Sequence, residues 1–294
     1  ERICDPILLG QKKRIIAVKE ELGLDFECEM IDVRYDSRRR EEYAEELHRL
    51  RGRRGLTRED AIRQLKSATY FAPMMVRMGD ADGYLGGVSH QYPDIVKPCL
   101  QVIGPDPESH RIVGMYMMTV NGQLMFIGDA TINIYPDART LAEIAIQTAK
   151  VAKRFGVKPK VAMLSFSNFG TSAEMRTDRI EEAIHIVREL DPDLIIDGPM
   201  QADTALVTDI QQDYPFMSFS GPANVLICPN LASANIAYKL LQRIAGAEMT
   251  GPILEGLSRP AHVLQRRDSV RDVVHMAAIC AVDAQRASKE RLID

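Results

Sequence analysis

A short loop rich in hydroxyl groups is the first candidate for chemistry. Residues 165–172 read Ser-Phe-Ser-Asn-Phe-Gly-Thr-Ser and end an apolar run, 160–167, whose composition is typical of a strand. A helical pattern follows at about 173–190, so the hydroxyls and the free N–H groups of a helix start could hold a phosphate. Helix capping by Ser and Thr explains the same residues equally well. Ser167 is therefore a candidate ligand-binding residue, with a purely structural role as the alternative.

A second candidate places arginines and an aspartate ahead of an apolar helix. The segment 265–272 reads Gln-Arg-Arg-Asp-Ser-Val-Arg-Asp and precedes the helical run 273–282. The guanidinium groups of Arg266 and Arg267 could bind a phosphate through paired hydrogen bonds. Asp272 falls in the first helical turn, where the helix dipole stabilises a carboxylate. That structural role is the simpler explanation for Asp272, and a role as general base is the alternative.

Two further segments carry weaker signals. Residues 79–87 contain four glycines, which indicates tight turns or the close approach of a ligand. The D-x-D-G sequence at 80–83 suggests calcium, but the residue spacing of a calcium-binding loop is missing, and we predict no metal site. Residues 34–66 contain eleven Lys or Arg, which is typical of a solvated helix face.

Composition argues against several classes of protein. The chain has 294 residues with 37 basic and 41 acidic side chains, and its net charge of −4 argues against nucleic-acid binding through bulk charge. No apolar run approaches the ~18 residues of a membrane span. The five scattered cysteines predict reduced thiols of a cytoplasmic protein. The sequence motifs of dinucleotide folds, P-loops, serine hydrolases and zinc proteases are absent. Because Glu1 stands where a start Met is usual, we expect a piece of a longer protein.

Alternating strand-like and helix-like segments predict a layered α/β fold. The predicted strands are the short apolar runs 7–9, 160–167, 194–196 and 225–227. Asp137 and Asn230 are predicted N-caps of helices. The dipeptide Asn121-Gly122 predicts a β-hairpin within 111–129, and thus a mixed sheet or a second subdomain that starts near residue 110.

Several motifs resemble the phosphate acetyl/butyryl transferase family. They are the segments 70–83 (Tyr-Phe-Ala-Pro-Met-Met-Val-Arg-Met-Gly-Asp-Ala-Asp-Gly), 159–167, 193–198, 223–231 and 251–257. The resemblance extends over essentially the whole chain. It implies two three-layer α/β subdomains with a cleft between them, similar to isocitrate dehydrogenase-like enzymes, and a homodimer. The implied subdomains are residues 1–108 with 255–294, and residues 109–254.

A closer resemblance is to the C-terminal domain of hybrid NADP-dependent malic enzymes. It rests on 86–98 (Gly-Gly-Val-Ser-His-Gln-Tyr-Pro-Asp-Ile-Val-Lys-Pro) and on the loop 165–172. The first function implied is therefore an acyl-CoA-binding regulatory and oligomerisation domain. An upstream domain, absent here, would oxidise and decarboxylate malate to pyruvate with NADP and Mg or Mn. For this chain the resemblance implies acetyl-CoA as a ligand and no cofactor.

The working residues of the transferases match this chain in part. Arg51 matches an arginine in a helix ahead of a Gly-Leu-Thr turn, and Asp272 matches the aspartate that deprotonates the CoA thiol. A phosphate-binding arginine of the family is Lys97 here, and its Ser-Arg pair is Gln265-Arg266. Lysine cannot form the paired hydrogen bonds of arginine, so we expect the two replacements to abolish useful turnover. The implied ligand-binding residues are Arg51, Lys97, Ser167, Gln265 and Arg266, with Asp272 catalytic only if transfer survives.

Two alternatives to a regulatory domain stay open. An active phosphate acetyltransferase would move an acetyl group between acetyl phosphate and CoA, with Asp272 as base and with Arg51 and Arg266 on the phosphate. A decarboxylating dehydrogenase of the same fold is the weaker alternative, because no set of metal-binding carboxylates stands out. We expect acyl-CoA in the cleft, with the same two arginines on its phosphates. The apolar helix 273–282 is expected to be buried in the core or in the dimer interface.

Overall fold

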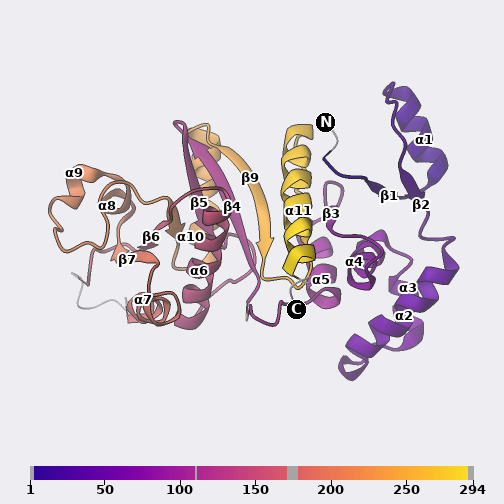
Figure 1. Ribbon diagram of the computed structural model, residues 1–294, viewed down its shortest axis with the longest axis horizontal. Helices are drawn as coiled ribbons and strands as arrows, with labels where there is room; N and C mark the ends of the chain where they lie inside the picture. Colours follow the sequence, from indigo (N-terminus) through magenta and orange to yellow (C-terminus); the bar gives the residue numbers. More distant parts are fainter. Residues whose placement is uncertain (1–2, 110, 171–177, 291–294) are drawn as a thin grey trace. The chain divides into compact units, whose positions relative to one another are not determined.

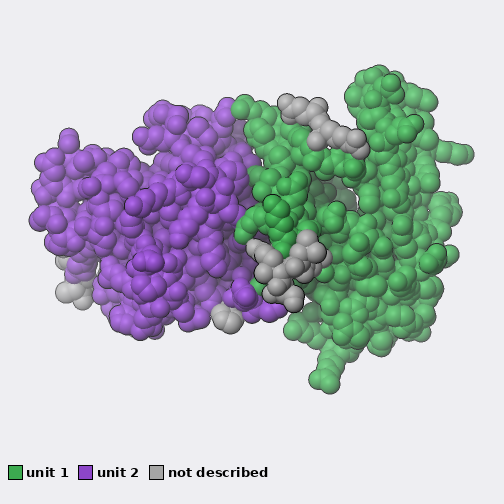
Figure 2. Space-filling view, viewed as in Figure 1, with its two compact units in different colours: residues 1–106, 257–294 green, residues 107–256 purple. Residues whose placement is uncertain are grey.

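The computed structural model describes residues 3–109, 111–170 and 178–290. The chain divides into two compact units, which Figure 2 shows in different colours. Unit 1 comprises residues 1–106 and 257–294, and unit 2 comprises residues 107–256. Both are mixtures of helices and strands. In the described ranges no helix is both long and apolar enough to cross a membrane.

Unit 2 is built on one mixed sheet of six strands (Figure 1). The strand order is β7-β6-β8-β5-β4-β9, and β5, β8, β6 and β7 run parallel. Strand β4 runs antiparallel to both β5 and β9. The strands are β4 (Val113–Val120), β5 (Gln123–Gly128), β6 (Lys160–Leu164), β7 (Ile195–Met200), β8 (Val225–Ile227) and β9 (Glu248–Glu255).

The predicted β-hairpin is confirmed and joins β4 to β5. Asn121 and Gly122 form its two-residue turn with φ angles of 49° and 77°, and Val120 pairs with Gln123 across it. Positive φ at both central positions matches the twist of the strands and favours Asn-Gly. Because β4 lies between β5 and β9, the hairpin is part of the main sheet and not an insertion beside it.

Two helices of unit 2 begin at their predicted caps, Asp137 and Asn230. The Asp137 carboxylate accepts the N–H of Thr140 at 2.8 Å, and the Asn230 side chain accepts the N–H of Ser233 at 2.9 Å. Part of the predicted helix 173–190 lies outside the described residues. The helices are α6 (Ala138–Arg154), α7 (Asp178–Leu190), α8 (Ala202–Leu206), α9 (Thr208–Gln211) and α10 (Leu231–Ile244).

The strands of unit 1 form two separate parallel pairs, β1 with β2 and β3 with β10. Both β1 and β3 line a cavity of about 1070 Å³. A three-layer unit 1 around one sheet is therefore not found in the described residues, because β1 and β3 each have a single strand partner. The strands, each of three residues, are β1 (Ile7–Leu9), β2 (Glu29–Ile31), β3 (Tyr84–Gly86) and β10 (Ala261–Val263).

Helices make up most of unit 1, and their buried faces form its core. Tyr43 of α2 packs on Phe71 of α4 with 5.1 Å between the ring centroids, and both side chains are fully buried. Helix α11 extends beyond the predicted run 273–282; Met276 is buried, whereas Val282 is exposed. The helices are α1 (Lys12–Glu21), α2 (Ser37–Arg51), the 3-10 helix η1 (Gly52–Arg54), α3 (Arg58–Gln64), α4 (Ala68–Met78), α5 (Tyr92–Val102) and α11 (Val270–Glu290).

Candidate functional site

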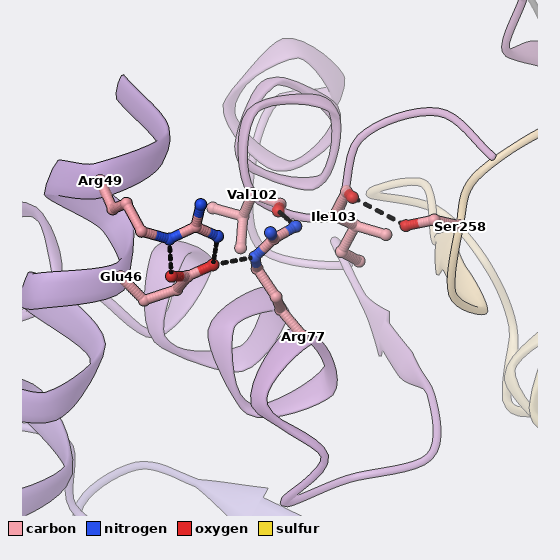
Figure 3. A network of polar contacts seen from close by, with 6 residues as sticks. All are labelled: Glu46, Arg49, Arg77, Val102, Ile103 and Ser258. Carbon is pink, nitrogen blue, oxygen red and sulfur yellow. Dashed lines mark hydrogen bonds and ion pairs between the residues drawn. The ribbon is translucent and has the colours of Figure 1, made fainter. Parts of the chain in front are cut away.

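A polar network fixes helix α2 against helices α4 and α5 (Figure 3). The Glu46 carboxylate accepts Nε and Nη2 of Arg49 at 2.6 and 2.7 Å, and Nε of Arg77 at 2.8 Å. Arg77 also donates from Nη1 to the carbonyl of Val102 at 3.0 Å. The hydrogen bonds from Arg49, and then that from Arg77, hold the pKa of Glu46 below its ordinary value although burial opposes this. The network thereby positions the helix that ends at Arg51.

A glycine turn ends α2 at Arg51. Gly55 has a φ angle of 87°, a left-handed conformation that glycine adopts without steric cost. Its N–H bonds the carbonyl of Gly52 at 2.9 Å, and the N–H of Leu56 bonds the carbonyl of Arg51 at 3.3 Å. Thr57 then caps α3 by accepting the N–H of Asp60 at 3.1 Å. The tight turn leaves the Arg51 side chain at the end of its helix.

Tyr70 links helix α4 to α5, the helix that carries Lys97. The Tyr70 hydroxyl of α4 donates to Oε1 of Gln101 on α5 at 2.7 Å. Burial raises the pKa of Tyr70, and the positive charge of Arg51 opposes that rise. Lys97 is exposed and stands four residues before Gln101, one helical turn away on the same face. The charge of Arg51 therefore acts on Tyr70, and Lys97 lies one helical turn from the glutamine that Tyr70 contacts.

Gln265, Arg266 and Asp272 form a second group at the start of α11. The segment leaves β10 beside the end of β3, where the N–H of Leu264 bonds the carbonyl of Gly86 at 2.8 Å. Oδ2 of Asp272 accepts both the N–H and the hydroxyl of Ser269 at 2.7 Å. Asp272 lies in the first turn of α11, as predicted, and the Ser269 hydroxyl caps the helix by accepting the N–H of Asp272 at 3.3 Å. In the described part of the chain its Oδ1 has no hydrogen-bond partner, so the cap leaves one oxygen open.

A second carboxylate lies in the same turn. Asp268 accepts the N–H of Gln265 at 2.6 Å and so shapes the segment that carries Arg266. Burial, and to a smaller extent the charge of Asp272, raises the pKa of Asp268. Arg266 itself is exposed. This arrangement places an exposed cation and an accessible carboxylate oxygen within one helix start.

Ser167 lies in unit 2, in the loop after β6. The neighbouring Asn168 holds this loop: its Nδ2 donates to Gln201 at 3.2 Å and to Tyr214 at 3.1 Å. Ser167 is only 7% exposed, and its hydroxyl has no hydrogen-bond partner among the residues described. An unsatisfied buried hydroxyl costs about 1–3 kcal/mol, which favours a partner supplied by water or a ligand.

The glycine-rich segment has a different position from these groups. Asp80, Asp82 and Gly87 line the 1070 Å³ cavity of unit 1, together with β1, β3 and α11. None of the predicted site residues lines that cavity. Across the described ranges, no cluster of three or more His, Cys, Asp or Glu could hold a metal ion.

Comparisons with known proteins bear on the family to which the chain belongs. The family model for phosphate acetyl/butaryl transferase matches residues 1–281. The chain belongs to the phosphate acetyl/butaryl transferase family. It is 37% identical over 283 residues to a phosphate acetyltransferase from Corynebacterium glutamicum, covering 96% of this chain and 86% of the relative.

Solved structures of the transferase family resemble the fold. A phosphotransacetylase from Streptococcus pyogenes has a TM-score of 0.90 and 36% identity, and a phosphotransacetylase from Staphylococcus aureus has a TM-score of 0.82 and 34% identity. In both cases the match covers 96% of this chain and 86% of the other. The mixed α/β fold is therefore that of the transferases.

These findings overturn the hypothesis of a regulatory domain of a malic enzyme. The whole-chain relatives named above are phosphate acetyltransferases or phosphotransacetylases, and nothing among them points to malate oxidation or NADP. The segments that suggested a malic enzyme were 86–98, which contains the connection between β3 and α5, and 165–172, of which the described residues 165–170 follow β6. Such connections vary within a family more than its scaffold does, so they were a poor guide to the parent protein.

Tyr70 and Gln101 were not among the predicted site residues. Tyr70 belongs to the family-like segment 70–83, but its type and spacing gave no sign of a partner 31 residues away. The spacing of Lys97 and Gln101 by four residues was the available signal, because it places both side chains on one helix face.

Proposed function

We propose that the chain is an active phosphate acetyltransferase, which moves an acetyl group between acetyl phosphate and CoA. The observation that carries the proposal is the geometry of Asp272. Ser269 fixes one oxygen of the carboxylate, whereas the other has no partner in the described chain. Acetyl phosphate and CoA are the substrates of phosphate acetyltransferases, and such enzymes match nearly the whole chain.

In the proposed reaction Asp272 acts as the general base. Its open oxygen takes the proton of the CoA thiol, and the resulting thiolate attacks the carbonyl carbon of acetyl phosphate. The bond between that carbon and the bridging oxygen then breaks, so acetyl-CoA forms and inorganic phosphate leaves. Arg51, Lys97 and Arg266 stabilise the negative charge that builds up on the leaving phosphate. Arg51 and Arg266 also bind the phosphate groups of CoA. Gln265 and Ser167 are further ligand-binding residues.

The replacements at Lys97 and Gln265 lower the rate in this proposal without abolishing it. A lysine ammonium group lacks the fork of arginine, but it still supplies a full positive charge to phosphate. Gln265 is held by the hydrogen bond from its N–H to Asp268, so its backbone has a defined place beside Arg266. CoA is thus a substrate in this proposal, and the chain's own side chains supply the acid–base chemistry.

A thioester-formation assay with acetyl phosphate and CoA tests the function. We expect turnover by the parent chain and a loss of about 10²–10⁴ in Asp272→Asn, since a general base commonly contributes that much. Asp268→Asn is the matched control, because it changes a carboxylate of the same turn and should stay within about tenfold of the parent. Absence of thioester formation by the folded parent chain would refute the proposal.

A homodimer is the second part of the proposal. Ile236, Leu240 and Ile244 are exposed apolar side chains spaced by four residues along α10. Val274 and Val282 are two further exposed apolar side chains, on α11. Exposed apolar patches of this kind are typical of interaction surfaces. Light scattering at micromolar concentration should return about twice the 32.9 kDa chain mass, and a monomer mass would contradict the dimer.

A further inference from the structure

Three helices of unit 1 carry hydrogen-bond donors near their ends. Arg51 is the last residue of α2, Tyr70 lies in the first turn of α4, and Gln101 lies in the last turn of α5. The side chains of Arg51 and Lys97 have no hydrogen bond or ion pair with any described residue. Arg51 is nevertheless partly buried, and a guanidinium group that has lost water favours an anionic partner.

Tyr70 determines which end of the Gln101 amide is open. The tyrosine hydroxyl donates to Oε1 at 2.7 Å, so the amide oxygen is already engaged. Nε2, which carries two N–H donors, has no partner in the described part of the chain. The reverse orientation would aim the amide oxygen at any anion bound by Arg51 and Lys97. An anion between the two cations therefore favours the orientation in which Nε2 points toward it.

We propose that Gln101 is a further ligand of the phosphate group of acetyl phosphate, through Nε2, and that Tyr70 is the positioning residue that orients its amide. This inference rests on the proposed function. Lys97 supplies a point charge, and Gln101, one turn further along α5, supplies directed N–H donors beside it. Together with the guanidinium group of Arg51, they present donors from two helices to one phosphate.

The test compares Gln101→Met and Tyr70→Phe with the parent chain. Gln101→Met keeps the length of the side chain but removes its donors, and the KM for acetyl phosphate should rise about tenfold, as expected for a hydrogen bond to a charged group. The KM for CoA should change less than about twofold. Tyr70→Phe should raise the KM for acetyl phosphate about threefold, because the amide then loses its orientation.

Gln64→Met is the matched control, since Gln64 ends α3 in the same unit and is not one of the proposed substrate residues. It should leave both KM values at those of the parent. Equal rises in both KM values, or an unchanged KM for acetyl phosphate in a folded Gln101→Met chain, would overturn the inference.

Calorimetry with inorganic phosphate separates this inference from the proposed function. If the parent lacks transfer activity, the function fails, but phosphate binding still tests the site. Phosphate should bind the parent about tenfold more tightly than Gln101→Met. Equal binding to both chains, or no binding to the parent, would overturn the role of Gln101 whatever the transfer assay shows.

Discussion

Unit 2 holds its strands in one sheet of six, whereas unit 1 holds its strands in two separate pairs. Most of the proposed substrate residues nevertheless lie in unit 1. They stand on α2 and α5 and on the segment that leads from β10 into the first turn of α11. In the described part of the chain, the side chains of Arg51 and Lys97 and Oδ1 of Asp272 have no hydrogen-bond partner. In unit 2 the corresponding candidate, Ser167, is a buried hydroxyl in a loop held by Asn168. The proposed chemistry therefore depends mainly on unit 1, the unit whose strands do not form one continuous sheet.

Matched substitutions in the cores of the two units should cause the largest losses of stability. Phe71 in unit 1 and Phe126 in unit 2 are both fully buried, and each change to Ala should cost about 3–5 kcal/mol of stability. Hydrogen exchange measures where the loss falls. Phe71→Ala should speed exchange in α2 and α4, and Phe126→Ala should speed it in β5 and β8. If either change speeds exchange equally in both units, the units do not differ in their local stability.

Substitutions of substrate residues should give the next largest effects. Arg266→Ala should lower kcat/KM by about 10²–10³, the usual loss for one contact that stabilises charge in the transition state. Ser167→Ala should lower it by only about tenfold, because a neutral hydroxyl makes a weaker contact with an anion. Arg243→Ala on α10 is the control and should match the parent. A larger loss from Ser167→Ala than from Arg266→Ala would reverse the assignment of the chemistry to unit 1.

Local signals explain which parts of the fold were predictable. The Asn121-Gly122 hairpin, the caps Asp137 and Asn230, and the strand 7–9 depend on residues close together in sequence. The division of unit 1 into two strand pairs was not predictable. Pairing of β3 with β10 joins Tyr84 to Ala261, and strands of three residues carry too little periodicity to reveal such a partner.

The candidate site shows the same limit. Asp272 and its capping partner Ser269 are three residues apart, and the local sequence was enough to predict that Asp272 lies in the first turn of the helix. The contact between Tyr70 and Gln101 spans two helices, and it depends on how α4 and α5 pack. The carboxylate network of Glu46 and Arg77 is equally non-local. Residue types indicated the chemistry of the cations, but only tertiary packing shows which neutral side chains stand beside them.

The pH dependence of stability should give the smallest effect, with opposite signs for one carboxylate in each unit. Hydrogen bonds from Arg49 and Arg77 hold the pKa of Glu46 below its ordinary value of 4.5. Its contribution is therefore fully present above about pH 4.5 and is lost as the pH falls through the lowered pKa. Burial raises the pKa of Asp129 above its ordinary value of 3.8. Its contribution is fully present below about pH 3.8 and is lost as the pH rises through the raised pKa.

Urea unfolding between about pH 3 and pH 6 measures both signs, since a shifted carboxyl pKa changes stability only near its folded and unfolded values. The stability difference between the parent and Glu46→Gln should shrink as the pH falls, because the parent loses an ionised partner of Arg77. The difference between the parent and Asp129→Asn should instead grow in favour of the parent as the pH falls. Glu182→Gln, an exposed position on α7, is the control and should give a flat difference. Equal slopes for Glu46→Gln and Asp129→Asn would show that the two units respond alike to acid. The two units would then differ in the arrangement of their strands and not in how the carboxylates of Glu46 and Asp129 make stability depend on pH.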